Sequence, residues 1–177
     1  VLDIVIGNDL SAEDVATVRI RSTARSADIL ADPSKYDPRS KETADHSLPY
    51  VIAAAVADRQ VTPVQFTQEK IMDPRIRAQL NKVEVIADPE IEKVFPELQR
   101  ADVEVHTTDG RTFSTRLDFP KGDPRNPLID SEIEAKFDAL AAPVMTDAAA
   151  DRLKEAVWGL EKQGSVTELM ALATSDR

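Results

Sequence analysis

The stretch Val103–Phe119, VEVHTTDGRTFSTRLDF, decides the fold class of this chain. Residues 103–107 alternate between apolar or small and polar side chains, as a strand with one buried face does. Asp109-Gly110 is a typical hairpin turn, and a second alternating run follows it from Arg111 to Phe119. The pattern predicts two adjacent antiparallel strands, so the fold contains at least part of an antiparallel sheet.

Shorter elements are predicted on both sides of this hairpin. Residues 16–22 alternate and residues 83–86 are a brief β-branched run, so both are expected to be strands. Capping residues followed by proline predict helices that begin at Thr62-Pro63 and Asp73-Pro74 and extend to about Lys70 and Asn81. The start of the chain, residues 1–7, fits either the tail of a helix or a strand, and the helix tail is the preferred interpretation.

Helical periodicity dominates the last third of the chain. Apolar residues repeat on one face from Ile133 to Ala141, behind a cap at Asp130 or Ser131, and again from 153 to 160. Ser165 and Glu168 form a capping-box pattern for a final helix. The expected fold class is therefore α+β, with a small antiparallel or mixed sheet of about four strands packed against several helices. We expect residues 1–177 to be a single domain, with residues 1–9 as a possible tail of a preceding helical domain.

The composition excludes several classes of function. Twenty-two Lys and Arg against 32 Asp and Glu give a formal charge of −10, which argues against nucleic acid or an anionic membrane as a partner. The absence of cysteine excludes a disulfide framework, a thiolate zinc site and an iron–sulfur cluster held by this chain. No apolar run approaches the ~20 residues of a membrane span, and the start lacks the basic residues of a signal peptide. A cytoplasmic location is expected.

One polar segment, Lys41–Tyr50 with the sequence KETADHSLPY, carries candidate chemistry. Ser47 can cap a helix whose first turn holds Pro49, and an early start would place His46 and Tyr50 on one face. Imidazole can accept or donate a proton near neutral pH, and a phenol can donate one. The alternative is that Tyr50 is a rim residue with a surface hydroxyl and that His46 is only a polar group at a helix start.

A second candidate group lies in the proline-rich loop Asp118–Leu128, DFPKGDPRNPL. Lys121 and Arg125 supply positive charge, and Gly122 lets main-chain N–H groups approach an anion, so the loop can form a carboxylate-binding lip. The alternative is a solvated turn in which the two aspartates of the loop neutralise the neighbouring cations. Residue types leave both interpretations open.

These two segments, together with Glu134-Ala-Lys-Phe137, resemble the C-terminal part of the MmgE/PrpD family. The resemblance is ordered along the chain and is strongest from Tyr36 to Val144. The family includes 2-methylcitrate dehydratase, cis-aconitate decarboxylase and iminodisuccinate epimerase. One departure is the turn 57–60, Ala-Asp-Arg-Gln, where relatives usually have a glycine.

The resemblance implies a domain plan and a site. Family members have a larger N-terminal helical domain and a smaller α+β lid, with the substrate cleft between them, and this chain looks like the lid. A tyrosine at the place of Tyr50 is an active-site residue in the related decarboxylases. We therefore expect Tyr50 and His46 to be catalytic. The expected substrate-binding residues are Asp45, Ser47, Lys121, Gly122 and Arg125. No metal and no cofactor are expected.

The first functional hypothesis is a cofactor-independent hydro-lyase that dehydrates 2-methylcitrate, or a similar tricarboxylate, in the methylcitrate cycle of propionate breakdown. The other members of the family, the epimerase and the decarboxylase, are alternatives, since all three begin by moving a proton next to a carboxylate. A non-catalytic α+β binding or assembly module is the alternative from another class. The isolated chain is expected to be inactive, and the full-length enzyme to be a homodimer through its helical domain.

Overall fold

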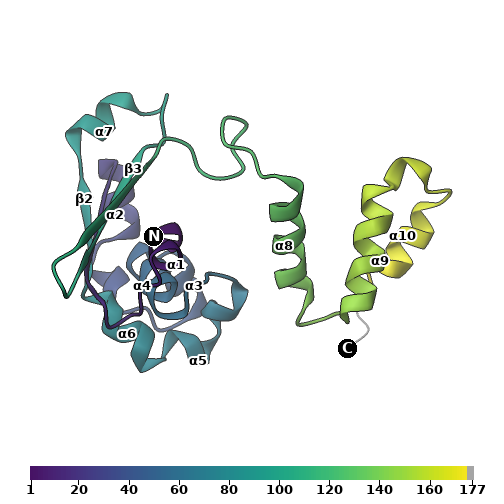
Figure 1. Ribbon diagram of the computed structural model, residues 1–177, viewed down its shortest axis with the longest axis horizontal. Helices are drawn as coiled ribbons and strands as arrows, with labels where there is room; N and C mark the ends of the chain where they lie inside the picture. The colour runs from purple at the N-terminus through teal and green to yellow at the C-terminus, as the bar shows by residue number, and fades with distance from the viewer. Residues whose placement is uncertain (175–177) are drawn as a thin grey trace. The chain divides into compact units, whose positions relative to one another are not determined.

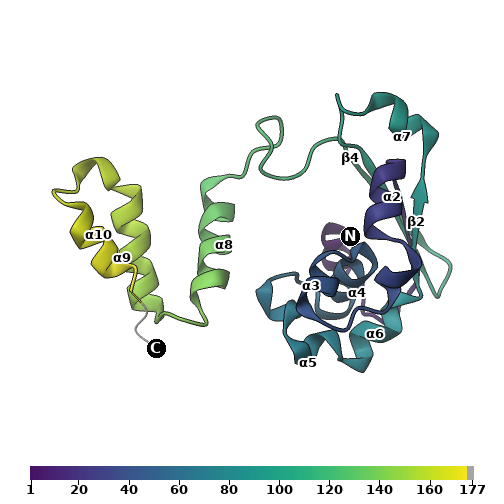
Figure 2. The same ribbon diagram turned by 180° about the vertical axis from the view of Figure 1, so that it is seen from behind.

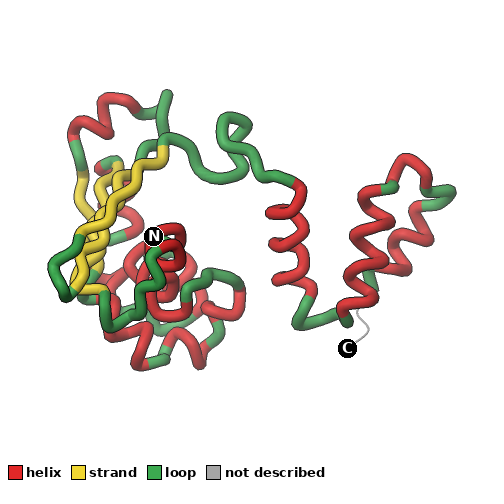
Figure 3. The backbone as a smooth tube through the Cα atoms, viewed as in Figure 1, coloured by secondary structure: helices red, strands yellow, loops and turns green. Residues whose placement is uncertain are grey.

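The protein is described by a computed structural model that covers residues 1–174 (Figure 1). The chain divides into two compact units, one from Val1 to Asn126 and one from Pro127 onward. All described strands lie in the first unit, and the described part of the second contains helices and loops (Figure 3). Each unit has a core of its own, and a single domain over residues 1–177 stays a prediction.

The first unit is built on a four-stranded sheet with the order β2-β1-β3-β4. The central strand β1 (Val15–Ser22) pairs in parallel with β2 (Val83–Ala87) and antiparallel with β3 (Ala101–Thr107). The predicted hairpin is confirmed, because β3 pairs antiparallel with β4 (Thr112–Leu117) and the turn contains Gly110 at φ +88°. The sheet is mixed, as the α+β prediction allowed.

Alternation along β1 gives the sheet one apolar and one polar face. Val18 and Ile20 are buried with residues of β2 and β3, as the period of two predicts. Arg19 lies on the opposite face, where it pairs with Glu84 at 3.0 Å and with Glu104 at 3.7 Å. These cross-strand ion pairs are solvent-exposed, so they define the outer face of the sheet and contribute little to its stability.

Two helices cover the apolar face. α1 (Leu2–Gly7), which the sequence predicts as a helix tail, and α4 (Leu48–Asp58) place Val5 and Val56 in the core of the sheet. The other side of α4 forms a second core with α6 (Pro74–Leu80). Ala53 and Ala54 are fully buried there, and their small side chains let the two helices pack closely. Helix α4 is therefore the central element of the unit.

The remaining helices of the first unit are short. α3 (Lys41–Asp45), α5 (Gln68–Ile71) and α6 gather around α4, as both Figure 1 and Figure 2 show. The 3₁₀ helix η2 (Pro63–Phe66) precedes α5. A single helix from Thr62 to about Lys70 was predicted and is wrong, because the Thr67 side chain caps a new helix by accepting a hydrogen bond from the Lys70 N–H. The elements outside this group are α2 (Ala24–Leu30), η1 (Pro33–Tyr36) and α7 (Pro89–Val94).

The second unit contains α8 (Asp130–Ala141), α9 (Asp147–Trp158), η3 (Leu160–Lys162) and α10 (Val166–Leu172). Its core is formed by residues of α8, α9 and the turn between them. Leu153, on the predicted apolar face of α9, is one of these core residues. The predicted cap of α8 at Asp130 or Ser131 is wrong. Ile129 is the N-cap, and Glu132 reaches back to accept its N–H at 2.9 Å. Among the described helices, none has both the length and the apolar character that crossing a membrane requires.

Candidate active site

Two short helices meet within the segment 40–50. The Ser40 side chain caps α3 by accepting a hydrogen bond from the Thr43 N–H. α3 ends after one turn at Asp45, and Ser47 starts α4 by accepting a hydrogen bond from the Tyr50 N–H at 3.0 Å. His46 therefore lies between the helices, as the C-cap residue of α3. An early helix start, which would have placed His46 and Tyr50 on one helical face, is not what the chain adopts.

The imidazole of His46 is exposed, and one hydrogen bond to the main chain fixes its orientation. Its Nδ1 lies 3.0 Å from the main-chain carbonyl oxygen of Glu42. A carbonyl oxygen can only accept, so Nδ1 carries the hydrogen of this bond. The neutral ring then presents Nε2 as a lone pair to its surroundings. That arrangement is the one that a general base requires.

A cavity of about 320 Å³ lies between α3 and the segment 61–66. Lys41 and Asp45 line it from α3, joined by an ion pair of 2.7 Å between Nζ and Oδ2. The opposite wall is Val61, Thr62, Pro63 and Phe66. His46 follows Asp45 directly in the chain. The cavity therefore combines a cation, a carboxylate and an apolar wall, and the residue that follows the carboxylate in the chain carries an exposed imidazole.

Ser47 and Tyr50 are placed in the interior of the unit. Ser47 is 1% exposed, and its hydroxyl donates to the Lys35 carbonyl oxygen at 2.5 Å. Tyr50 is fully buried, and its hydroxyl donates to the main-chain carbonyl oxygen of Gln65, also at 2.5 Å. The alternative in which Tyr50 is a rim residue with a surface hydroxyl is wrong, because its ring packs in the second core against Phe66. A catalytic role for Tyr50 and a binding role for Ser47 stay predictions.

Burial also changes the acidity of this tyrosine. Desolvation, with the nearby charges of Asp58 and Asp73, raises the pKa of Tyr50 to about 12. The phenol thus stays protonated at physiological pH and keeps its hydrogen bond to Gln65. The group acts as a fixed donor in this chain.

A buried polar cluster behind the cavity was not predicted. The carboxylate of Asp58 is 7% exposed and accepts hydrogen bonds from Lys70 at 2.6 Å and from Arg75 at 3.1 Å. It also accepts from the side-chain nitrogen of Gln65 at 3.0 Å. The pattern Thr62-x-x-Gln65 matches a capping box and could have identified Gln65. No local pattern signals Asp58, whose partners lie 7 to 17 residues away.

Opposing effects set the pKa of Asp58. Burial disfavours its charged form, but the hydrogen bonds from Lys70 and Gln65, together with the charges of Lys70 and Arg75, outweigh desolvation and hold the pKa below its ordinary value. The neighbouring residue Arg59, the C-cap of α4, has φ +55°. Its guanidinium donates to the exposed carboxylate of Asp9 at 2.7 Å.

The loop that carries Lys121, Gly122 and Arg125 is closed by its own contacts. The Gly122 N–H donates to the Asn126 carbonyl oxygen at 2.8 Å, and φ at Gly122 is +96°. Arg125 forms a bidentate pair with Asp123 and lies 3.9 Å above the ring of Phe119. Its hydrogen bonds lower the pKa of Asp123 to about 2. The carboxylate-binding lip stays a prediction, and its main cation is neutralised within the loop.

The structure does not bring all the predicted site residues together. Asp45 and His46 lie at the end of α3, whereas the loop 118–126 follows β4 and is drawn apart from α3 in both Figure 1 and Figure 2. Among the described residues, no group of three or more His, Asp and Glu side chains is arranged to hold a metal ion. Within this chain, the candidate site is the cavity between α3 and η2.

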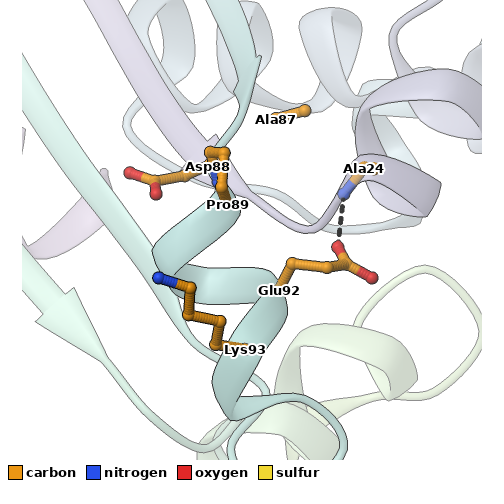
Figure 4. A pocket seen from close by; sticks show the side chains of 6 residues that line it. All are labelled: Ala24, Ala87, Asp88, Pro89, Glu92 and Lys93. Atoms are coloured by element: carbon orange, nitrogen blue, oxygen red, sulfur yellow. Dashed lines mark hydrogen bonds between the residues drawn. The ribbon is translucent and has the colours of Figure 1, made fainter.

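A larger cavity, of about 360 Å³, lies between α2 and α7 (Figure 4). Its charged residues already have partners. Glu92 points to the main-chain nitrogen of Ala24 and accepts its hydrogen bond at 2.9 Å, whereas Asp88 caps α7 and Lys93 pairs with Glu90 at 2.6 Å. The rest of the lining is alanine and proline, so this cavity lacks the polar groups that would hold a carboxylate.

Comparisons with known proteins relate this chain to one family of enzymes. Over 124 residues the chain is 33% identical to cis-aconitate decarboxylase of Homo sapiens and 30% identical to that of Mus musculus, in both cases over 70% of this chain. It is 30% identical to the cis-aconitate decarboxylase-like protein oryM of Aspergillus oryzae over 128 residues, 72% of this chain. These matches span only 25 to 26% of the relatives' own length. Because residues 2–162 match the model of the MmgE/PrpD C-terminal domain, the chain belongs to the MmgE/PrpD family and corresponds to its C-terminal domain.

Proposed function

We propose that this chain is the lid side of a cofactor-independent lyase, which acts on a citrate-like tricarboxylate by moving a proton next to a carboxylate. The first candidate reaction is the dehydration of 2-methylcitrate or a similar tricarboxylate. The observation that carries the proposal is His46. Its Nδ1 lies 3.0 Å from the Glu42 carbonyl oxygen, which leaves Nε2 as the nitrogen that exchanges a proton, and His46 directly follows Asp45, which lines the cavity together with Lys41.

In the dehydration, Nε2 of His46 takes the proton from the carbon next to a carboxylate. The electron pair of that C–H bond forms the carbon–carbon double bond, and the hydroxyl group leaves as water with a proton from an acid on the opposite side of the cleft. Lys41 holds a substrate carboxylate, for which the substrate competes with Asp45. Imidazole serves this role because its ordinary pKa, about 6.5, is close to neutral pH.

A second candidate, decarboxylation of cis-aconitate, is favoured by the similarity to two cis-aconitate decarboxylases and one cis-aconitate decarboxylase-like protein at 30 to 33% identity. In that reaction the bond between carbon and the carboxylate breaks and carbon dioxide leaves. The electron pair stays on carbon and is protonated, and the imidazolium of His46 is the donor. The same residue thus serves both reactions, with its proton moving in opposite directions. Epimerisation of iminodisuccinate needs only the removal and return of one proton.

The chain is proposed to act together with an N-terminal helical domain, which closes the cleft from the other side and forms the contacts of a homodimer. The lip of Lys121, Gly122 and Arg125 is proposed as a second carboxylate-binding group. To bind substrate there, Arg125 must exchange Asp123 for the substrate carboxylate. The enzyme that contains this chain is proposed to be located in the cytoplasm.

The test is an assay of the enzyme that joins this chain to a family N-terminal domain, with 2-methylcitrate, cis-aconitate and iminodisuccinate offered separately. Proton NMR distinguishes the unsaturated dehydration product from the decarboxylation product, and carbon dioxide release is measured in parallel. Water elimination from 2-methylcitrate supports the first candidate, and carbon dioxide release from cis-aconitate supports the second. Absence of turnover with all three substrates, by a folded enzyme, would overturn the proposal in favour of a binding or assembly module.

A further inference from the structure

The wall of the candidate cavity that faces α3 contains one fully buried polar side chain, that of Gln65. Thr62, Pro63 and Phe66 line the cavity, and Gln65, between them, points inward and is fully buried. Its side-chain oxygen accepts hydrogen bonds from the Thr62 N–H at 3.0 Å and from the Thr62 hydroxyl at 2.9 Å. Gln65 therefore closes the turn that forms this wall.

The orientation of the Gln65 amide is fixed by its neighbours. The Thr62 N–H can only donate, so the amide oxygen must face Thr62. The amide nitrogen then faces the Asp58 carboxylate, which can only accept, at 3.0 Å. Reversing the amide would break both contacts. Asp58 thus specifies the single orientation of Gln65 in which the turn 62–66 is closed.

Asp58 is itself held on three sides. Lys70 of α5 and Arg75 of α6 donate to its two oxygens, and the residue ends α4. The carboxylate of Asp58 is therefore tied to α4, α5 and α6. Its two cationic partners are Lys70 and Arg75. The hydroxyl of Tyr50 attaches the turn 62–66 directly to α4 by donating to the Gln65 carbonyl oxygen. Together these contacts tie the turn 62–66 to α4, α5 and α6.

We propose that Asp58 is a positioning residue, which acts through Gln65 to hold the turn 62–66 in place as the substrate-facing wall of the cavity next to His46. The carboxylate does not touch the substrate. Its role is to keep one wall rigid, so that a substrate held at Lys41 meets a preformed surface. The substrate-facing part of this inference rests on the proposed function, whereas the attachment of the turn can be measured without any activity.

The variants exploit the chemistry of the Asp58–Gln65 pair. Gln65→Glu keeps the oxygen that faces Thr62 but turns a donor into an acceptor opposite the Asp58 carboxylate, so the two groups repel. The double variant Asp58→Asn/Gln65→Glu restores one donor and one acceptor with the two exchanged, and its new carboxylate at position 65 is the acceptor for Lys70, which in the wild type donates to the same Asp58 oxygen as Gln65. Asp102→Asn is the matched control, since Asp102 also has a mostly buried carboxylate in a bidentate pair, with Arg116, but on the sheet.

The first measurement is amide hydrogen exchange of residues 62–66 by NMR in the 177-residue chain. We expect Gln65→Glu to accelerate exchange at the Thr62 N–H by about tenfold or more relative to the amides of α4, corresponding to a weakening of at least ~1.4 kcal/mol by the usual conversion. The double variant should recover most of the protection, and Asp102→Asn should not change it. Unchanged exchange in Gln65→Glu would overturn the inference.

The second measurement uses the enzyme that contains this chain, with the substrate that it turns over. For Gln65→Glu we expect KM to rise about tenfold or more while kcat falls less than about threefold, which is the signature of lost binding without lost chemistry. The double variant should recover KM. Faster exchange with an unchanged KM would overturn the positioning role and leave the proposed function intact. An inactive wild-type enzyme would overturn the proposed function, and the exchange data alone would then support or overturn the attachment of the turn by Asp58.

Discussion

The hydroxyl group of Tyr50 donates a 2.5 Å hydrogen bond to the main-chain carbonyl oxygen of Gln65, and both residues are fully buried. The bond joins the first turn of α4 to the turn 62–66 that forms one wall of the candidate site. A side chain that the sequence suggests as a proton donor therefore holds α4 and the turn 62–66 together. The hydroxyl group supplies a buried hydrogen-bond donor that a phenylalanine at this position would lack.

Tyr50→Phe should lower the stability of the chain. The substitution keeps the ring but leaves the buried Gln65 carbonyl without its side-chain donor, at a cost of about 1–3 kcal/mol. The measurement is the free energy of unfolding in urea for the 177-residue chain, with kcat of the enzyme recorded beside it. An unchanged unfolding midpoint together with a loss of ~10²-fold in kcat would instead place the hydroxyl at the substrate.

Asp58→Asn should destabilise the chain at neutral pH and not in acid. The pKa of Asp58 is lower in the folded state, so its carboxylate stabilises the fold above the unfolded-state pKa of about 3.9, and this contribution is lost as pH falls through the folded-state pKa. At neutral pH we expect a difference of roughly 1–3 kcal/mol, typical of hydrogen bonds to charged groups.

Urea unfolding of wild type and Asp58→Asn across a pH series measures this difference directly. It should be constant near neutral pH and shrink in acid, where the wild-type carboxyl becomes protonated and resembles the amide. Asp9→Asn is a suitable control because the Asp9 side chain is 90% exposed and forms only a surface pair with Arg59. A difference between wild type and Asp58→Asn that is independent of pH would contradict the assignment.

His46→Gln should abolish most of the activity of the enzyme and leave its stability unchanged. A positioned acid or base contributes typically 10² to 10⁴-fold, and we expect kcat to fall by about 10²-fold or more. The side chain is exposed, so the unfolding midpoint should move little. His106→Gln is the matched control, since His106 is the other histidine of the chain and lies on the polar face of the sheet beside Thr112. Equal kcat values for the two variants would remove His46 from the proposed chemistry.

Asp123→Asn should tighten substrate binding if the loop 118–126 is a carboxylate-binding lip. The substitution removes the carboxylate that occupies the Arg125 guanidinium, so a substrate carboxylate no longer has to displace it. We expect KM to fall about threefold, in line with the 0.2–1 kcal/mol of an exposed ion pair. Asp109→Asn is the control, because it breaks an aspartate–arginine pair with the same spacing, Asp109 with Arg111, in the hairpin. A KM unchanged in both variants would leave the loop as a solvated turn.

The 177-residue chain alone should show no turnover of 2-methylcitrate or cis-aconitate. Proton removal and protonation of the leaving group require groups on both faces of a closed cleft, and positioning of this kind accounts for about 7–11 kcal/mol of a barrier. The chain spans about a quarter of the length of the relatives that it matches. The measurement is product formation by proton NMR at high protein concentration, with the two-domain enzyme as the positive control. Turnover by the chain alone would show that its domain plan is different.

Much of the fold could be predicted from the sequence because the responsible interactions are local. The hairpin depends on Asp109-Gly110 and on alternation within a few residues of it, and β3 and β4 pair as that pattern requires. The pair Asp73-Pro74 starts α6 through an Asp73 cap, since the Asp73 carboxylate and the Arg75 N–H that donates to it are two residues apart in the chain. The parallel pairing of β1 with β2 could not be predicted, because it joins Val18 to Val83 across several helices.

For the site, the sequence by itself determined the family, through motifs that match over residues 2–162, and the residue types available for chemistry at Lys41–Tyr50. Only the tertiary structure decided which of them face solvent. One helix ends at Asp45 and the next begins at Leu48, so His46 is turned outward and Tyr50 inward. The contacts of Asp58 with Gln65, Lys70 and Arg75 were likewise decided by the tertiary structure. These partners come from three later elements, and contacts between elements depend on how helices pack and not on periodicity within any one of them.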